Sequence, residues 1–183
     1  MAENKSLDMY DILILIFAAS TDCNRVIGRT SIQKLAYFVV NVLGIDNDYI
    51  HYYYGPFSPL LTNVLRHLVS LNWVSENYSL TENHRGIYTY TLTESGKQYS
   101  EGLINNYKES FDKIKKIVDN VKEIKGDMIE TLSCAAKIYY IKFKEKNLLD
   151  DYNLKQSAKK YGWNLNDDNL LKNSNDWLTI IQD

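Results

Sequence analysis

The sequence has little of what metal sites require. Of its 183 residues, two are cysteines and three are histidines. Cys23 and Cys134 are far apart and show no metal-ligand spacing, which indicates two reduced thiols and a reducing, cytoplasmic setting. His51, His67 and His84 have no cysteine or carboxylate partner at a ligand spacing. The sequence therefore predicts no metal and no cofactor.

The common motifs of catalysis are absent as well. The sequence has no Gly-x-Ser-x-Gly elbow, no phosphate-binding Gly-rich loop and no dinucleotide fingerprint. Paired carboxylates occur at Asp150-Asp151 and Asp167-Asp168. Both pairs stand at predicted helix starts, where the helix dipole favours acids. Capping explains them better than acid–base chemistry does, so we expect that the protein is not an enzyme.

The chain also lacks a long hydrophobic run and an excess of either charge. Its longest apolar run, Ile12 to Ala19, is far shorter than the roughly 18 residues of a membrane-spanning helix. The residues before this run are more acidic than basic, unlike a signal peptide, so a buried helix is expected. The net charge is −2, and neither half of the chain is basic. Any surface for a nucleic acid must therefore be local.

What the chain does have is a well-defined stretch from Tyr49 to Leu71. Tyr49 to Tyr54 is aromatic and predicts a strand, which Gly55-Pro56 ends. Ser58 suits a helix N-cap and Pro59 the first helical position. The helix that follows is amphipathic. Its apolar side holds Leu61, Val64, Leu65 and Leu68, and its outer side holds Pro59, Thr62, Asn63, Arg66 and Ser70, with His67 at the margin.

Two helices are predicted before this stretch. The first covers residues 7–20 and is followed by a polar loop over 21–28. The second covers residues 29–43, with Thr30 or Ser31 as its cap. Gly44 is placed to end it in the left-handed conformation.

A β-hairpin is predicted after the stretch. Residues 73–80 and 87–92 have β patterns, and residues 81–86 supply the turn. The resulting order is helix, helix, strand, helix, hairpin. This is the order of a winged helix-turn-helix domain with one added strand, in which the hairpin is the wing.

The last third of the chain is predicted to be helical. Thr93 caps a long helix over about 94–125, and about three further helices follow, near 128–143, 150–161 and 167–181. The long helix carries a heptad seam, which predicts either a homodimer contact or packing in a local bundle. The seam residues are Ile104, Tyr107, Phe111, Ile114, Val118 and Val121.

These patterns predict an α+β fold that is mainly α. Residues 1–100 form a winged helix-turn-helix domain with a small antiparallel sheet, and residues 101–183 form a helical C-terminal region.

Two motifs resemble a known family. Ile32-Gln33-Lys34-Leu35-x-Tyr37-Phe38, with Tyr53-Tyr54-Gly55-Pro56-Phe57-Ser58, is similar to the uncharacterised YwgA-like winged-helix family. It more loosely resembles Panacea-type antitoxin domains. Tyr88-x-Tyr90-x-Leu92-Thr93-x-x-Gly96 resembles the wing-to-helix junction of PadR- and MarR-like regulators. These resemblances lie within residues 29–107 and imply a winged-helix fold, in families whose members bind DNA or proteins.

The first functional hypothesis is a dimeric transcriptional regulator that binds double-stranded DNA. The helix after Gly55-Pro56 would enter the major groove, where Asn can pair with adenine and Arg with guanine. The wing tip and the second helix would contact phosphates. The candidate residues are Ser58, Thr62, Asn63, Arg66 and His67 on the helix, and Arg29, Lys34, Asn83, His84 and Arg85 at the wing and phosphates.

The alternative is a non-enzymatic adaptor or antitoxin-like module that binds a protein on the same fold. The nearly neutral charge and the single arginine of the outer helix stripe favour it. In this hypothesis the C-terminal helices hold the partner. The clustered Tyr49, Tyr52, Tyr53 and Tyr54 are expected to serve core and interface packing.

Overall fold

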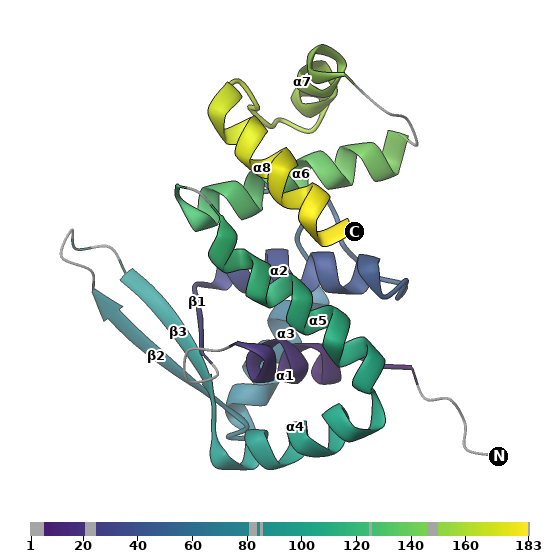
Figure 1. Ribbon diagram of the computed structural model, residues 1–183. Helices are drawn as coiled ribbons and strands as arrows, with labels where there is room; N and C mark the ends of the chain where they lie inside the picture. Colours follow the sequence, from purple (N-terminus) through teal and green to yellow (C-terminus); the bar gives the residue numbers. More distant parts are fainter. Residues whose placement is uncertain are drawn as a thin grey trace.

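The computed structural model describes residues 6–20, 25–80, 84, 86–124, 126–145 and 150–182. Helices and a small antiparallel sheet alternate in the first half, and only helices follow (Figure 1). The elements are α1 Met9–Ala19, β1 Arg25–Ile27, α2 Arg29–Val42, α3 Pro59–Ser70, β2 Val74–Leu80, β3 Gly86–Leu92, α4 Glu94–Asn106, α5 Lys108–Asn120, the 3₁₀ turn η1 Val121–Glu123, α6 Met128–Glu145, α7 Asp151–Lys160 and α8 Asp168–Gln182.

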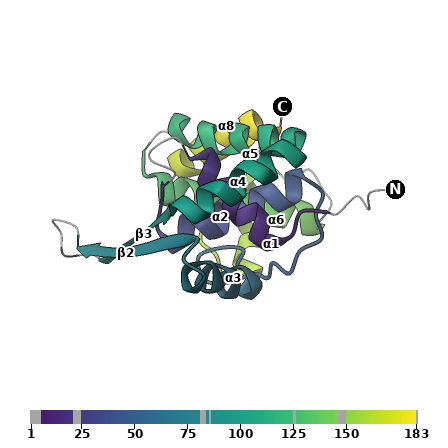
Figure 2. The same ribbon diagram turned by 90° about the horizontal axis from the view of Figure 1, so that it is seen from below.

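The winged helix-turn-helix order and the mainly α fold are confirmed. β2 and β3 pair antiparallel and form the wing, which projects away from the body, and α3 lies at the surface beside its base (Figures 1 and 2). β1 pairs with the other edge of β3, so the sheet order is β1-β3-β2. The predicted polar loop over 21–28 therefore contains a short strand, which its three residues are too few to reveal by periodicity.

The predicted strand over Tyr49 to Tyr54 is wrong. In its place, Ile50 and Phe57 form one isolated antiparallel bridge, and the chain reverses between them. Gly55 has a φ of +104°, and its N–H donates to the carbonyl of Tyr52. The reversal comes too soon after Ile50 for a ladder to extend.

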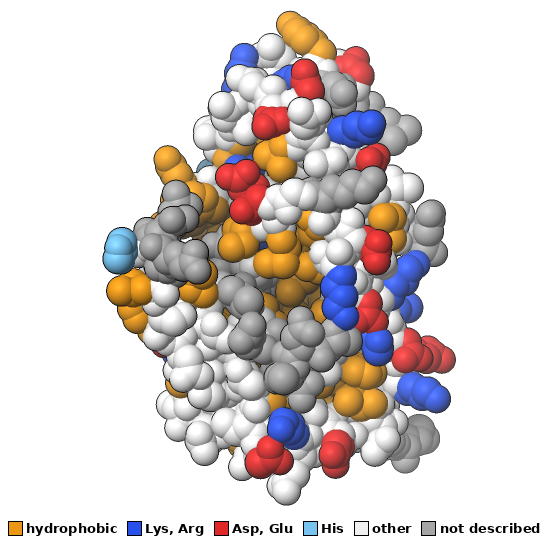
Figure 3. Space-filling view, turned by 60° about the vertical axis from the view of Figure 1, so that its left-hand side comes forward, with side chains coloured by type: hydrophobic (Ala, Val, Ile, Leu, Met, Phe, Trp, Pro, Cys, Tyr) orange, Lys and Arg blue, Asp and Glu red, His pale blue; other side chains and the backbone are white. Residues whose placement is uncertain are grey.

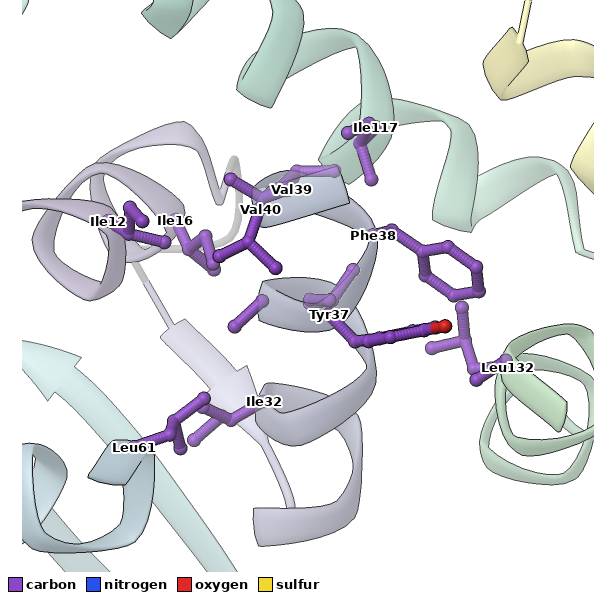
Figure 4. Packing of buried hydrophobic residues seen from close by; sticks show 14 of the residues in the cluster. Ile12, Ile16, Ile32, Tyr37, Phe38, Val39, Val40, Leu61, Ile117 and Leu132 are labelled. Carbon is purple, nitrogen blue, oxygen red and sulfur yellow. The ribbon is translucent and has the colours of Figure 1, made fainter. Parts of the chain in front are cut away.

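Helix α2 is the centre of the core. α1 and α3 lie on one side of it, and α5 and α6 lie on the other (Figure 4). Residues 31–40 of α2 are all buried, including the polar Gln33 and Lys34. The N-cap is Gly28, without a side-chain hydrogen bond, so the predicted cap at Thr30 or Ser31 is wrong. Gly44 ends this helix region with a φ of +66°, as predicted.

The predicted long helix over 94–125 is two helices, α4 and α5, with a break at Tyr107. Tyr107 has a φ of −128° and a ψ of 43°, and its N–H still donates to the carbonyl of Leu103. The break lets both helices pack against α1. A straight helix would leave one of them without this contact.

The heptad seam lies in the chain's own core. Ile114 and Val118 are buried, and α5 packs against α1, α2 and α8. Ile104, Tyr107, Phe111 and Val121 are partly buried against the same core. The bundle alternative accounts for these contacts.

The three C-terminal helices begin just after the aspartates that were expected to stand at their N-termini. Asp127, Asp150 and Asp167 each accept a hydrogen bond from a backbone N–H in the first turn that follows, so capping explains these carboxylates. Helix α6 packs against α2 on one side and against α7 and α8 on the other. Across the described part of the chain, no helix has both the length and the apolar character to cross a membrane.

Candidate functional site

The two motifs that resemble the YwgA-like family touch each other in space. The Gln33 side chain donates from Nε2 to the carbonyl of Ser58 at 3.0 Å, and its Oε1 accepts from the Ser58 N–H at 3.0 Å. The Lys34 Nζ donates to the carbonyl of Pro56 at 2.7 Å. Adjacent residues of α2 thus hold the chain on both sides of Phe57. We call residues 52–57 the tyrosine turn.

The start of α3 is fixed by the same network. Ser58 Oγ accepts from the N–H of Leu61 at 2.9 Å and donates to Asp48 at 2.5 Å. The second carboxylate oxygen of Asp48 accepts from the N–H of Leu60 at 3.2 Å. A carboxylate at this end also opposes the positive end of the helix dipole. The turn and α3 therefore have a defined geometry.

The C-terminal region also holds the tyrosine turn, through a hydrogen bond from Trp163. Trp163 follows α7, and its indole Nε1 donates to the carbonyl of Tyr52 at 2.7 Å. Trp163 stacks on Tyr161, with 5.2 Å between ring centroids, and meets Tyr140 edge-on. The hydrogen bond ties the turn to this aromatic cluster, although Tyr52 lies 111 residues from Trp163 in the sequence.

The tyrosines of the turn point to solvent. Tyr52, Tyr53 and Tyr54 are 56%, 77% and 62% exposed, and Leu60 at the start of α3 is also exposed. Of the expected core and interface packing, the core part is wrong for these three tyrosines, and the interface part stays a prediction. The core part is right for Tyr49, which is buried and donates from its hydroxyl to the carbonyl of Gln33. Burial of one such exposed tyrosine in the interface with a partner can stabilise the complex by about 1 kcal/mol or more.

A cavity of about 290 Å³ opens beside the turn. Helices α2 and α3, the tyrosine turn and the base of the wing form its walls. Its aromatic and apolar lining comes from Tyr52, Tyr54, Phe57, Leu61 and Leu65. Its charged lining comes from Arg29, Lys34, Arg66 and Glu76.

Lys34 has an unusual environment for a lysine. It is only 2% exposed, and no carboxylate of the described residues pairs with it. A Cβ added to Gly55 would lie 3.4 Å from Lys34 Nζ and 3.3 Å from Lys137 Cγ, so the two lysines approach each other at the turn. Burial, together with the charge of Lys137, lowers the pKa of Lys34 to about 7. Burial lowers the pKa of Lys137 too.

Arg29 has its own counter-charge. Its guanidinium lies 3.8 Å above the Tyr88 ring, donates to the Tyr90 hydroxyl at 2.9 Å and pairs with Glu76 at 3.3 Å. The Tyr90 hydroxyl also donates to Glu76, and burial together with this carboxylate raises the pKa of Tyr90 to about 12. Arg29 thus joins the first turn of α2 to the wing.

Several predicted DNA-contact residues are not available for contact. Ser58 is completely buried and Lys34 nearly so, because both hold the turn. Neither lies on the outer surface that a DNA backbone would contact, so the expectation that they face DNA is wrong; Lys34 borders only the cavity. Thr62 is half-buried and accepts from Gln33. His67 is exposed but shares a 2.7 Å hydrogen bond with the Tyr10 hydroxyl.

Other predicted residues are exposed. Asn63 and Arg66 lie on the outer side of α3, and His84 stands on the wing at a φ of +55°. Asn83 and Arg85 lie outside the described residues, as does Cys23. Cys134 is buried, which raises the pKa of its thiol.

Sequence reasoning missed four residues that build the site. Gln33, Glu76, Tyr90 and Trp163 each act through a partner 14 or more residues away. For Gln33 alone a signal existed, because a polar residue in the apolar stretch of α2 needs a buried partner. Within the described residues, no group of three or more His, Cys, Asp or Glu side chains is placed to hold a metal ion.

A protein of Bacillus subtilis is similar to this chain. The chain is 25% identical to the uncharacterised protein YwgA of Bacillus subtilis (strain 168) in an alignment of length 145 that covers 72% of this chain and 84% of that protein. This similarity confirms the resemblance inferred from the two motifs. No family model matches the chain.

Proposed function

We propose that this protein is a non-enzymatic, protein-binding module on a winged-helix fold, which holds its partner through the tyrosine turn and the outer face of α3. The observation that carries the proposal is the display of Tyr52, Tyr53 and Tyr54 on a turn held from two sides. Tyrosine is enriched among the residues that dominate binding energy, and a turn that is already ordered loses little entropy on binding.

The charges favour a protein over a nucleic acid. Of the bases predicted to face DNA, Lys34 is buried and Arg29 is paired with Glu76. Figure 3 shows the side of the wing and not that of α3, and there basic and acidic side chains are interspersed around a group of hydrophobic ones. A DNA-binding face usually carries a basic patch. In the alternative hypothesis the C-terminal helices held the partner. In this proposal they instead support the tyrosine turn, and the turn holds the partner.

Capture of the native partner tests the proposal. The tagged full chain and its Tyr53→Ser/Tyr54→Ser variant are purified from the host cell, and bound proteins are identified by mass spectrometry. Because both tyrosines are exposed, the variant should melt at the wild-type temperature. We expect at least about tenfold lower recovery of the partner, as for the loss of a binding hot spot.

The matched control is Tyr152→Ser. Tyr152 is 70% exposed on α7, outside the turn. A partner recovered equally by wild type, control and turn variant would refute the proposal.

A second candidate is binding of double-stranded DNA by a transcriptional regulator. Asn63 and Arg66 favour it, because both are exposed on α3 beside the base of the wing (Figure 2). A homodimer would double these contacts, through a surface other than the seam on α5. Fluorescence anisotropy over a salt series should then show affinity that falls steeply with salt. Arg66→Glu should abolish binding and Lys116→Glu on α5 should not; absence of binding at low salt rejects this candidate.

A further inference from the structure

The cavity beside the tyrosine turn combines an aromatic wall with charged side chains. Its volume of about 290 Å³ is at the lower limit of the roughly 300–1,000 Å³ of small-molecule pockets, so it suits one or two inserted side chains. The aromatic rings of Tyr52, Tyr54 and Phe57 form part of its wall. The wall is continuous with the exposed tyrosines through which the proposed partner would bind.

The charges of the cavity are unbalanced. Three bases line it, Arg29, Lys34 and Arg66, against one acid, Glu76. Glu76 pairs with Arg29 and accepts a hydrogen bond from Tyr90, so its carboxylate does not pair with Lys34 or Arg66. Lys34 donates one hydrogen bond, to the Pro56 carbonyl, and has no carboxylate among the described residues. An ammonium group has three donors, so Lys34 can bond an additional acceptor in the cavity.

We propose that this cavity receives an acidic side chain, Asp or Glu, of the bound partner protein, whose carboxylate accepts hydrogen bonds from Lys34 and Arg66. The inference deepens the proposed function and rests on it. A buried ammonium without a counter-charge is costly, and a carboxylate that is hydrogen-bonded beside it offsets part of that cost. The aromatic wall covers the aliphatic part of the inserted chain. The partner is therefore one that presents an exposed acid flanked by apolar residues.

The protonation of Lys34 provides the readout. The charged and titratable groups around the cavity are Lys137 on α6, Arg29 on α2, Arg66 on α3, Glu76 on β2, Tyr90 on β3, and Tyr52 and Tyr54 of the turn. Only Glu76 among them is an acid. A carboxylate bound next to Lys34 favours its charged form and so raises its pKa.

The experiment uses the full chain with ¹³C-labelled lysine. The Lys34 Cε signal, assigned through its own backbone, is followed by NMR from pH 5 to 11. The probe is N-acetyl-glutamate amide, the isosteric control is N-acetyl-glutamine amide, and sodium chloride matches the ionic strength. We expect the midpoint to lie near 7 in the free protein and to move to higher pH with the glutamate probe alone. Arg66→Gln should reduce this movement, and Lys172→Gln on α8 should not.

Three outcomes would overturn the inference. They are a Lys34 midpoint near the ordinary lysine value in the free protein, no movement with the glutamate probe, and equal movement with the glutamine probe or with chloride. The test is independent of partner capture. Carboxylate binding together with unchanged capture by the Tyr53→Ser/Tyr54→Ser variant would keep the cavity site and reject the proposed function. If the Tyr53→Ser/Tyr54→Ser variant loses the partner but the cavity binds no carboxylate, the proposed function stands and the cavity site is rejected.

Discussion

Lys34 shows how one residue can serve both structure and binding. Its hydrogen bond to the Pro56 carbonyl holds the tyrosine turn, and its burial leaves the amine without a counter-charge. Both effects follow from its place in the stretch of α2, residues 31–40, that is buried on every side. At the same position methionine would fill a similar volume but could not donate the hydrogen bond.

The free energy of unfolding should depend on pH through Lys34. Its pKa is about 7 in the folded protein against 10.5 in a free chain. Between these values the unfolded chain binds more protons at this residue, so folding becomes more favourable as pH rises. Below pH 7 the full cost of burial is present. Relative to Lys34→Met, the wild type should gain up to about 1.4 kcal/mol per pH unit between pH 7 and 9.

Urea denaturation at several pH values measures this slope. Lys34→Met provides the reference, because the other titratable groups, the buried tyrosines included, are the same in both proteins and cancel in the difference. Lys172→Met, at an exposed position of α8, should give a curve parallel to the wild type. Parallel curves for wild type and Lys34→Met would show that Lys34 is not desolvated.

At the scale of elements, the junction of β2, β3 and α4 depends on a close backbone approach. Thr93 caps α4 by accepting from the N–H of Gly96 at 3.2 Å, and its hydroxyl donates to the carbonyl of Asn72 at 2.6 Å. A Cβ on Gly96 would lie 2.1 Å from the carbonyl oxygen of Trp73. This contact explains the glycine in the Leu92-Thr93-x-x-Gly96 motif, because no larger residue fits against that carbonyl.

Alanine scanning of the two glycines of α4 tests this explanation. Gly96→Ala should lower the free energy of unfolding by about 1–3 kcal/mol, as overpacking typically does. Gly102 is exposed on the same helix with nothing within 4 Å of an added Cβ. Gly102→Ala should raise the same free energy by up to about 1 kcal/mol through helix propensity. Equal effects of the two substitutions in urea denaturation would contradict the close approach.

At the scale of the whole molecule, the C-terminal region is part of the winged-helix core. Helix α5 packs on α1 and α2, α6 packs on α2, and Trp163 bonds to the tyrosine turn. One cluster of buried hydrophobic residues extends from Leu7 to Ile181. The sequence-based boundary near residue 100 therefore separates two parts that share a core.

The shared core predicts the effect of a charge in the heptad seam. Ile114 is completely buried, so Ile114→Asp places an unpaired carboxylate in the core and should unfold the chain. Circular dichroism should show loss of helix, and sedimentation should show an expanded or aggregated species. Lys116→Asp, exposed on the same helix, should stay folded. A folded monomer from Ile114→Asp, beside a dimeric wild type, would instead identify the seam as a dimer contact.

Local signals were sufficient for the elements whose periodicity and caps are strong. Helix α3 begins after Ser58 with Pro59 in its first turn, and the wing strands follow their alternating pattern, both as predicted. β1 was missed because three residues give no period. The break at Tyr107 was missed because its apolar spacing continues the heptad, and only packing against α1 decides where the helix bends.

The sequence by itself determined the fold class, the wing and the caps of α3, α4 and the C-terminal helices, because these depend on residues a few positions apart. The candidate site was decided by tertiary structure. Gln33 and Lys34 meet Pro56 and Ser58 only when α2 packs beside the turn, and Trp163 reaches Tyr52 only when the C-terminal helices fold back. Whether a tyrosine is displayed or buried, and whether a lysine keeps its charge, depends on neighbours that the chain brings from far away in the sequence.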